Sequence, residues 1–74
     1  MKYRELAKRL RELGCEYVRP GRGSHRIWYN PANGRFTTIP DWGNKDLKPG
    51  MLRTILRDLG LRPENLYRSQ GSDR

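Results

Sequence analysis

The sequence predicts a two-layer α+β domain in which two helices pack side by side on one face of a three-stranded antiparallel sheet, in the order α-β-β-β-α. Apolar residues recur at helical spacing near both ends of the chain, and three β-prone segments separated by turn-forming residues lie between them. Each helix has one apolar stripe to bury, and the sheet offers one face for both. The other face is expected to lie towards solvent.

The first helix is expected over residues 2–13, where charged residues alternate with an apolar face. Gly14 is expected to end this helix in the left-handed conformation. Cys15 follows directly and is expected to be a small, half-buried apolar residue. The apolar face has the i, i+3, i+4, i+7 spacing and consists of Tyr3, Leu6, Ala7, Leu10 and Leu13.

Two turns divide the middle of the chain into short strands that form an antiparallel meander. Pro20 ends the first strand, and Gly21 to Gly23 has the composition of a turn. Residues 30–34 form a hairpin connection, in which Asn33-Gly34 suits positive φ angles. The expected strands cover residues 15–19, 24–30 and 35–39.

The second helix is expected to begin at Lys48, with Pro49 at the first helical position, where its missing N–H costs nothing. Gly60 ends this helix as Gly14 ends the first. Residues 61–67 allow one further helical turn. Residues 1–67 are thus expected to form one domain, and the polar residues 68–74 a flexible tail. The apolar face of the second helix consists of Leu52, Ile55, Leu56 and Leu59.

Strand alternation makes the orientation of the second strand a choice between two faces. One face carries His25, Ile27 and Tyr29, and the other carries Ser24, Arg26, Trp28 and Asn30. Because Trp28 is the largest apolar side chain on the strand, we expect it to pack beneath the helices and His25 to face solvent. The reverse arrangement would place His25 at the edge of the core, and composition alone barely separates the two.

The charge of the chain points to a polyanionic partner. Sixteen Lys and Arg residues stand against eight Asp and Glu, giving a net charge of +8 and a pI near 10.4. Twelve of these cations are arginines, whose planar fork suits phosphate oxygens. Nucleic acid is the partner that such a balance most often indicates. The alternative is a basic surface that is simply solvated.

Several classes of site are excluded by the residues available. One histidine and one cysteine provide neither a disulfide framework nor a zinc site, so no metal or cofactor is expected. Every nucleophile–imidazole set would need His25, and the adjacent Ser24 projects to the opposite side of a strand. Asp41 and Asp46 are expected to be turn and capping residues. With no signal peptide or membrane span, a soluble cytoplasmic protein is expected.

The chemistry that remains is one in which the substrate supplies its own nucleophile. The 2′-hydroxyl of RNA can attack the adjacent phosphate once a base removes its proton. An imidazole with a pKa near 6.5 suits that role, and one such base contributes roughly 10²–10⁴-fold. His25 is therefore the candidate general base, with Arg22 and Arg26 as phosphate contacts. The Gly21 to Gly23 turn could let the backbone approach a phosphate, or it could be only a hairpin turn.

Further residues could extend an RNA-binding surface. Tyr29 could stack a base on the exposed sheet face, as aromatic residues on open sheets do. Four cations in the second half of the chain could contact phosphates, and their alternative role is an ordinary solvated surface. They are Lys45, Lys48, Arg53 and Arg57.

Four segments, in this order and spacing, resemble the HicA toxin family. They are Gly23-Ser24-His25, Thr38-Ile39-Pro40, residues 45–50 and residues 52–60, and the resemblance covers residue 3 to about residue 66. It implies a fold like that of double-stranded-RNA-binding domains and an mRNA-cleaving toxin. It also implies a HicB antitoxin that binds the toxin and blocks its histidine. By position, His25 matches the catalytic histidine and Gly23-Ser24 the pair before it.

One departure from the family pattern concerns the segment after Pro40. Many members carry a second histidine there, whereas this chain has Asp41-Trp42-Gly43. Either the activity is weaker here, or Lys45 substitutes. Two functions of other classes also stay open: a module that grips structured RNA without cutting it, and an adaptor whose basic face meets an acidic protein.

Overall fold

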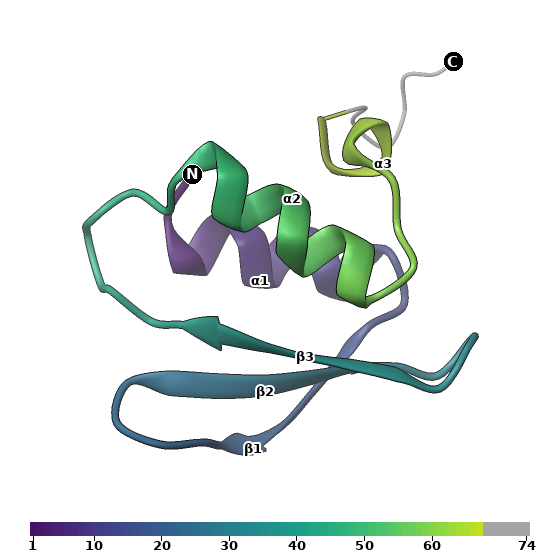
Figure 1. Ribbon diagram of the computed structural model, residues 1–74, viewed down its shortest axis with the longest axis horizontal. Coiled ribbons are helices and arrows are strands. Elements are labelled where there is room, and N and C mark those ends of the chain that lie inside the picture. Colours follow the sequence, from purple (N-terminus) through teal and green to yellow (C-terminus); the bar gives the residue numbers. More distant parts are fainter. Residues whose placement is uncertain (68–74) are drawn as a thin grey trace.

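The computed structural model describes residues 1–67, and within them the chain forms six elements in the order α-β-β-β-α-α (Figure 1). The expected tail at residues 68–74 lies outside the described residues. The boundaries that the sequence predicts for the first helix and the three strands all lie within one residue of those observed. The elements are α1 (Tyr3–Glu12), β1 (Glu16–Pro20), β2 (His25–Asn30), β3 (Arg35–Pro40), α2 (Pro49–Asp58) and α3 (Pro63–Tyr67).

The three strands form one antiparallel sheet in the spatial order β1-β2-β3. Figure 1 shows α1 and α2 lying on the same side of this sheet, with no helix on the other side. The predicted two-layer α+β architecture is confirmed. Because β2 is central, β3 is an edge strand, and α2 packs beside it.

Trp28 is the centre of the hydrophobic core. Its side chain has no exposed surface and lies on the sheet face towards the helices, as predicted. Its indole Nε1–H donates a hydrogen bond to the Tyr3 hydroxyl of α1 at 3.1 Å. The Tyr17 ring meets it edge-on at 6.0 Å between centroids, and the Arg11 guanidinium lies 5.2 Å from the ring centroid. These contacts satisfy both the apolar and the polar parts of the indole.

The other large buried side chains come from every helix and from β3. Leu6 and Leu10 of α1, Leu56 of α2 and Leu66 of α3 are each at most 1% exposed, and they surround Trp28 and Ile39 in a single cluster. No helix within residues 1–67 has the length and apolar character needed to cross a membrane.

Cys15 corrects one expectation, because it is buried rather than half-buried, with 3% of its surface exposed. The hydrogen bond from its backbone N–H to the Leu10 carbonyl draws the residue under the end of α1. Burial raises the pKa of the Cys15 thiol, so little of the reactive thiolate forms near neutral pH. Cys15 is therefore a packing residue.

The β2–β3 hairpin is fastened to the end of α2. Asn30 is buried, and its side-chain amide donates to the Leu59 carbonyl at 2.8 Å; Asn33 donates to the same oxygen at 3.0 Å. Positive φ angles were expected at both Asn33 and Gly34. Gly34 has one, with φ 75°, whereas Asn33 does not. Gly60 follows with φ 73°, and a Cβ there would collide with the Asn33 amide. Glycine is required at this junction.

Replacing Trp28 tests its place in the core. The change Trp28→Phe removes the hydrogen bond to Tyr3 and leaves a gap, and we expect it to lower the free energy of unfolding by about 1–3 kcal/mol. Phe36→Leu changes a ring that is 56% exposed and should stay within about 0.5 kcal/mol of the original protein. Urea unfolding followed by far-ultraviolet circular dichroism measures both. Equal unfolding midpoints for the two variants would contradict the packing described.

Candidate active site

His25 is the first residue of β2, and its side chain is exposed. The preceding turn fixes its backbone: the His25 N–H donates to the Arg22 carbonyl at 2.9 Å, and the Gly21 N–H donates to the His25 carbonyl at 2.9 Å. Gly23 turns the chain between them with φ 54°. The predicted orientation is confirmed, since Trp28 is inside and His25 is outside.

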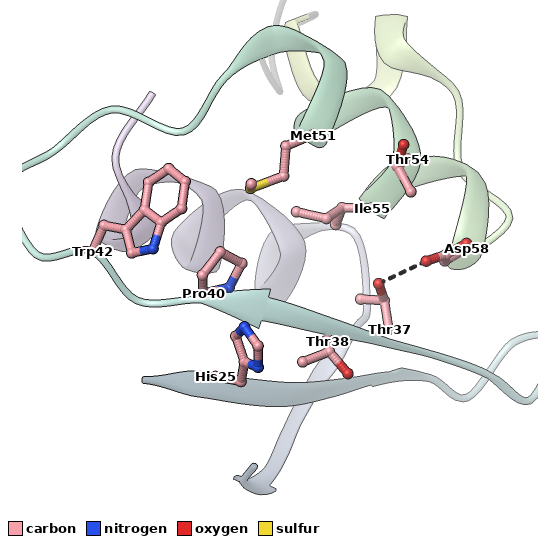
Figure 2. Close-up of a pocket in the computed structure, with 9 residues that line it drawn as sticks. All are labelled: His25, Thr37, Thr38, Pro40, Trp42, Met51, Thr54, Ile55 and Asp58. Atoms are coloured by element: carbon pink, nitrogen blue, oxygen red, sulfur yellow. Dashed lines mark hydrogen bonds between the residues drawn. The ribbon is translucent and has the colours of Figure 1, made fainter. Parts of the chain in front are cut away.

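A hollow of about 310 Å³ lies beside the His25 imidazole, between β3 and α2 (Figure 2). We call it the His25 hollow. Figure 2 shows the imidazole near Pro40, which is its partner in the β2–β3 ladder. The hollow is lined by His25, Thr37, Thr38, Pro40, Trp42, Met51, Thr54, Ile55 and Asp58.

The far end of the His25 hollow is polar. The Thr37 hydroxyl donates to the Asp58 carboxylate at 3.1 Å, and the Thr54 hydroxyl donates to the Gly50 carbonyl at 3.2 Å. Sequence reasoning missed this end. The signal was present, because Met51, Thr54, Ile55 and Asp58 stand at i, i+3, i+4 and i+7 on one side of α2.

Arg26 does not share the face of His25. Its guanidinium lies 3.6 Å from the Asp41 carboxylate, and another of its nitrogens donates to the His25 carbonyl at 3.1 Å. Alternation of β2 turns Arg26 towards the side of Trp28, where the segment after β3 supplies Asp41. Arg22 and Ser24 are exposed in the turn next to His25, and the Ser24 carbonyl accepts a hydrogen bond from the Asp41 N–H at 2.9 Å.

A second hollow, of about 540 Å³, brings together three residues that sequence analysis selected: Ser24, Lys45 and Lys48. Asp41 and Asp46 line it with them, so its charge is mixed. Trp42 lines both hollows. Lys45 lines the second hollow and not the His25 hollow, and its substitution for a second histidine stays a prediction.

The remaining predicted cations, Arg53 and Arg57, are exposed on α2. Successive residues of a helix are rotated by about 100°, so both point well away from the side that lines the His25 hollow. Arg57 also provides its carbonyl to the Arg35 guanidinium at 3.3 Å. The structure does not bring these two arginines together with His25.

Tyr29 lies on the outer sheet face with His25, as predicted. Its ring is half-buried against Phe36, with 4.5 Å between centroids and 37° between planes. Phe36 is the more exposed of the two rings and was not selected from the sequence. The aromatic surface available to a ligand on this face is therefore a pair of rings.

Residues 3–61 match a family model described as "HicA toxin of bacterial toxin-antitoxin". The chain belongs to the HicA toxin family. It is also 37% identical over 62 residues to a protein of Pseudomonas fluorescens (strain Pf0-1) named "Probable mRNA interferase HicA", an alignment that covers 84% of this chain and 98% of the relative. No solved structure matches the chain.

Membership of the HicA family confirms the resemblance seen in the sequence, and the α+β fold agrees with what that resemblance implied. Within residues 1–67, no three His, Cys, Asp or Glu side chains lie together in a way that could hold a metal ion. The HicA resemblance selects His25 as the functional side chain, and this imidazole borders the hollow between β3 and α2. This hollow is the candidate active site.

Proposed function

We propose that this HicA-family protein is a ribonuclease that cleaves mRNA, with His25 as its general acid–base residue. The observation that carries the proposal is the placement of His25: its side chain is exposed at the start of β2 and borders a hollow that could receive part of a nucleotide. The name of the Pseudomonas fluorescens relative, which contains "mRNA interferase", supports the choice of substrate.

The cleavage we propose uses the 2′-hydroxyl of the RNA as nucleophile. The neutral imidazole of His25 takes the proton from this hydroxyl, and the oxygen forms a bond to the adjacent phosphorus. The bond from phosphorus to the 5′ oxygen breaks, that oxygen takes a proton from solvent, and His25 returns its own proton to solvent. The products are a 2′,3′-cyclic phosphate and a free 5′-hydroxyl. The scheme contains no metal and no cofactor.

Positive charge near the scissile phosphate stabilises the transition state. Arg22 stands in the turn before His25, where Gly23 and Ser24 leave the backbone exposed. Lys45 and Lys48 in the second hollow extend the phosphate-binding surface, and Tyr29 stacks a base. Arg26 joins this surface when it leaves Asp41. Arg53 and Arg57 contact a more distant part of the RNA, because α2 turns them away from the His25 hollow.

A HicB-like antitoxin is the proposed partner, and it neutralises the toxin by covering His25. An exposed imidazole beside an open hollow can be blocked by a protein surface without any change in the fold. Cytoplasmic mRNA is the proposed substrate, so the cytoplasm is the proposed compartment.

The alternative is a module that binds structured RNA and cuts nothing. Its support is the segment Asp41-Trp42-Gly43, which replaces the second histidine found in many HicA toxins and leaves His25 as the single imidazole. One general base gives only a slow enzyme, so the two functions must be separated by experiment.

The substitution His25→Ala tests the catalytic role. We expect it to abolish both growth arrest on expression and cleavage of purified RNA, while the circular dichroism spectrum and thermal midpoint stay unchanged because the side chain is exposed. Glu64→Gln, on α3, is the matched control and should leave toxicity intact. Full toxicity of His25→Ala would overturn the proposal.

Incubation of the purified protein with long RNA in EDTA separates the ribonuclease from the binding module. We expect fragments with 2′,3′-cyclic phosphate ends, and we expect no cleavage of an oligonucleotide that lacks the 2′-hydroxyl at every position. Intact RNA with a gel shift that weakens as salt rises would instead indicate the binding module. The absence of RNA binding at low salt would favour a protein adaptor.

A further inference from the structure

The His25 hollow contains one carboxylate that the proposed cleavage does not use. Asp58, the last residue of α2, lines the hollow in a protein whose net charge is +8. A carboxylate repels phosphate and accepts hydrogen bonds, so this end of the hollow favours a group that is uncharged and donates hydrogen bonds. In RNA, such groups are the ribose 2′-hydroxyl and the donors of the bases, and only a base presents two of them side by side in one plane.

The walls of the hollow also suit a base. Pro40, Trp42, Met51 and Ile55 provide an apolar lining, and Figure 2 shows Trp42 at one end with Asp58 at the other. An apolar lining of this kind excludes water and packs against the flat faces of a base. The volume of about 310 Å³ is at the lower end of small-molecule pockets, about 300–1,000 Å³, and is too small for a duplex.

The Asp58 carboxylate is held in one orientation by its neighbour. The Thr37 hydroxyl donates to one carboxylate oxygen at 3.1 Å, and Thr37 itself is buried with 6% of its surface exposed. A carboxylate has about four acceptor positions, so capacity remains on both oxygens for donors from a ligand. Two neighbouring donors in one plane match this acceptor pair best.

Guanine is the RNA base that presents two neighbouring donors, N1–H and the 2-amino group, on its Watson–Crick edge. Adenine and cytosine present a donor beside an acceptor, and uracil presents one donor between two acceptors. We propose that the His25 hollow binds an unpaired guanine, with Asp58 accepting from N1–H and the 2-amino group and the apolar lining packing on the base. Thr37 acts as a positioning residue through Asp58.

This inference rests on the proposed ribonuclease function and specifies its substrate. A guanine bound in the hollow places the phosphate of its own nucleotide, or of the neighbouring one, at the imidazole that borders the hollow. Because the Watson–Crick edge is used by Asp58, the guanine cannot be base-paired at the same time. The substrate is therefore single-stranded RNA that contains guanosine.

The test measures binding, so that cleavage does not enter it. The full chain carrying His25→Ala is titrated into fluorescently labelled uridine decamers with guanosine, inosine or adenosine at one central position. We expect the guanosine decamer to bind about tenfold or more tightly than the adenosine decamer, with inosine between them because it lacks the 2-amino group. Fluorescence anisotropy gives the dissociation constants.

Asp58→Asn, added to His25→Ala, should remove the preference for guanosine, because the amide offers one donor and one acceptor. Asp58 is exposed and asparagine has its shape, so the fold should persist, as a thermal melt will show. Glu64→Gln is the matched control and should keep the preference.

Equal affinity for the guanosine and adenosine decamers would overturn the proposed guanine site, as would a guanosine preference that survives Asp58→Asn. If either result is found and the protein with His25 intact still cleaves RNA, the ribonuclease function stands and only the guanine site is wrong. Guanosine-selective binding by a protein that cleaves no RNA would instead overturn the ribonuclease function alone.

Discussion

The burial of Trp28 is the constraint on which the rest of the structure depends. Side chains alternate along a strand, so an indole that faces the helices forces His25, three positions earlier, onto the opposite face. Truncating a buried tryptophan costs about 3–5 kcal/mol, a large part of the 5–15 kcal/mol that holds a typical domain together. The reversed strand would therefore lose a large part of the stability of the fold.

The second element of the site is placed by the hairpin rather than by the core. Asn30 and Asn33 both donate to the Leu59 carbonyl, which fastens the end of α2 to the β2–β3 turn. Asp58 immediately precedes Leu59, and the hydrogen bond that it accepts from Thr37 of β3 adds a third link between the hairpin and the end of α2. The width of the His25 hollow is thus fixed by polar contacts between the β2–β3 hairpin and the end of α2, while Trp28 fixes the side on which His25 stands.

Most of the fold could be predicted from the sequence, because the patterns that specify it are local. The helical spacing of apolar residues predicted both main helices, the composition of the turns predicted the strand order, and the size of Trp28 predicted the orientation of β2. The site could be predicted only in part. Asp58 and Thr54 enter it because α2 packs beside β3, and Arg26 pairs with Asp41 across the end of the sheet. Such contacts between segments distant in sequence leave little trace in composition.

The single histidine allows one measurement to test the central claim, that burial of Trp28 places His25 at the RNA-binding surface. The rate at which diethyl pyrocarbonate modifies His25 can be followed by mass spectrometry in the folded protein, in urea, and with a 2′-O-methyl RNA that cannot be cleaved. The structure predicts that His25 reacts nearly as fast when folded as when unfolded, and that the RNA slows the reaction. A histidine already protected in the free protein, or one whose reaction the bound RNA leaves unchanged, would contradict the account.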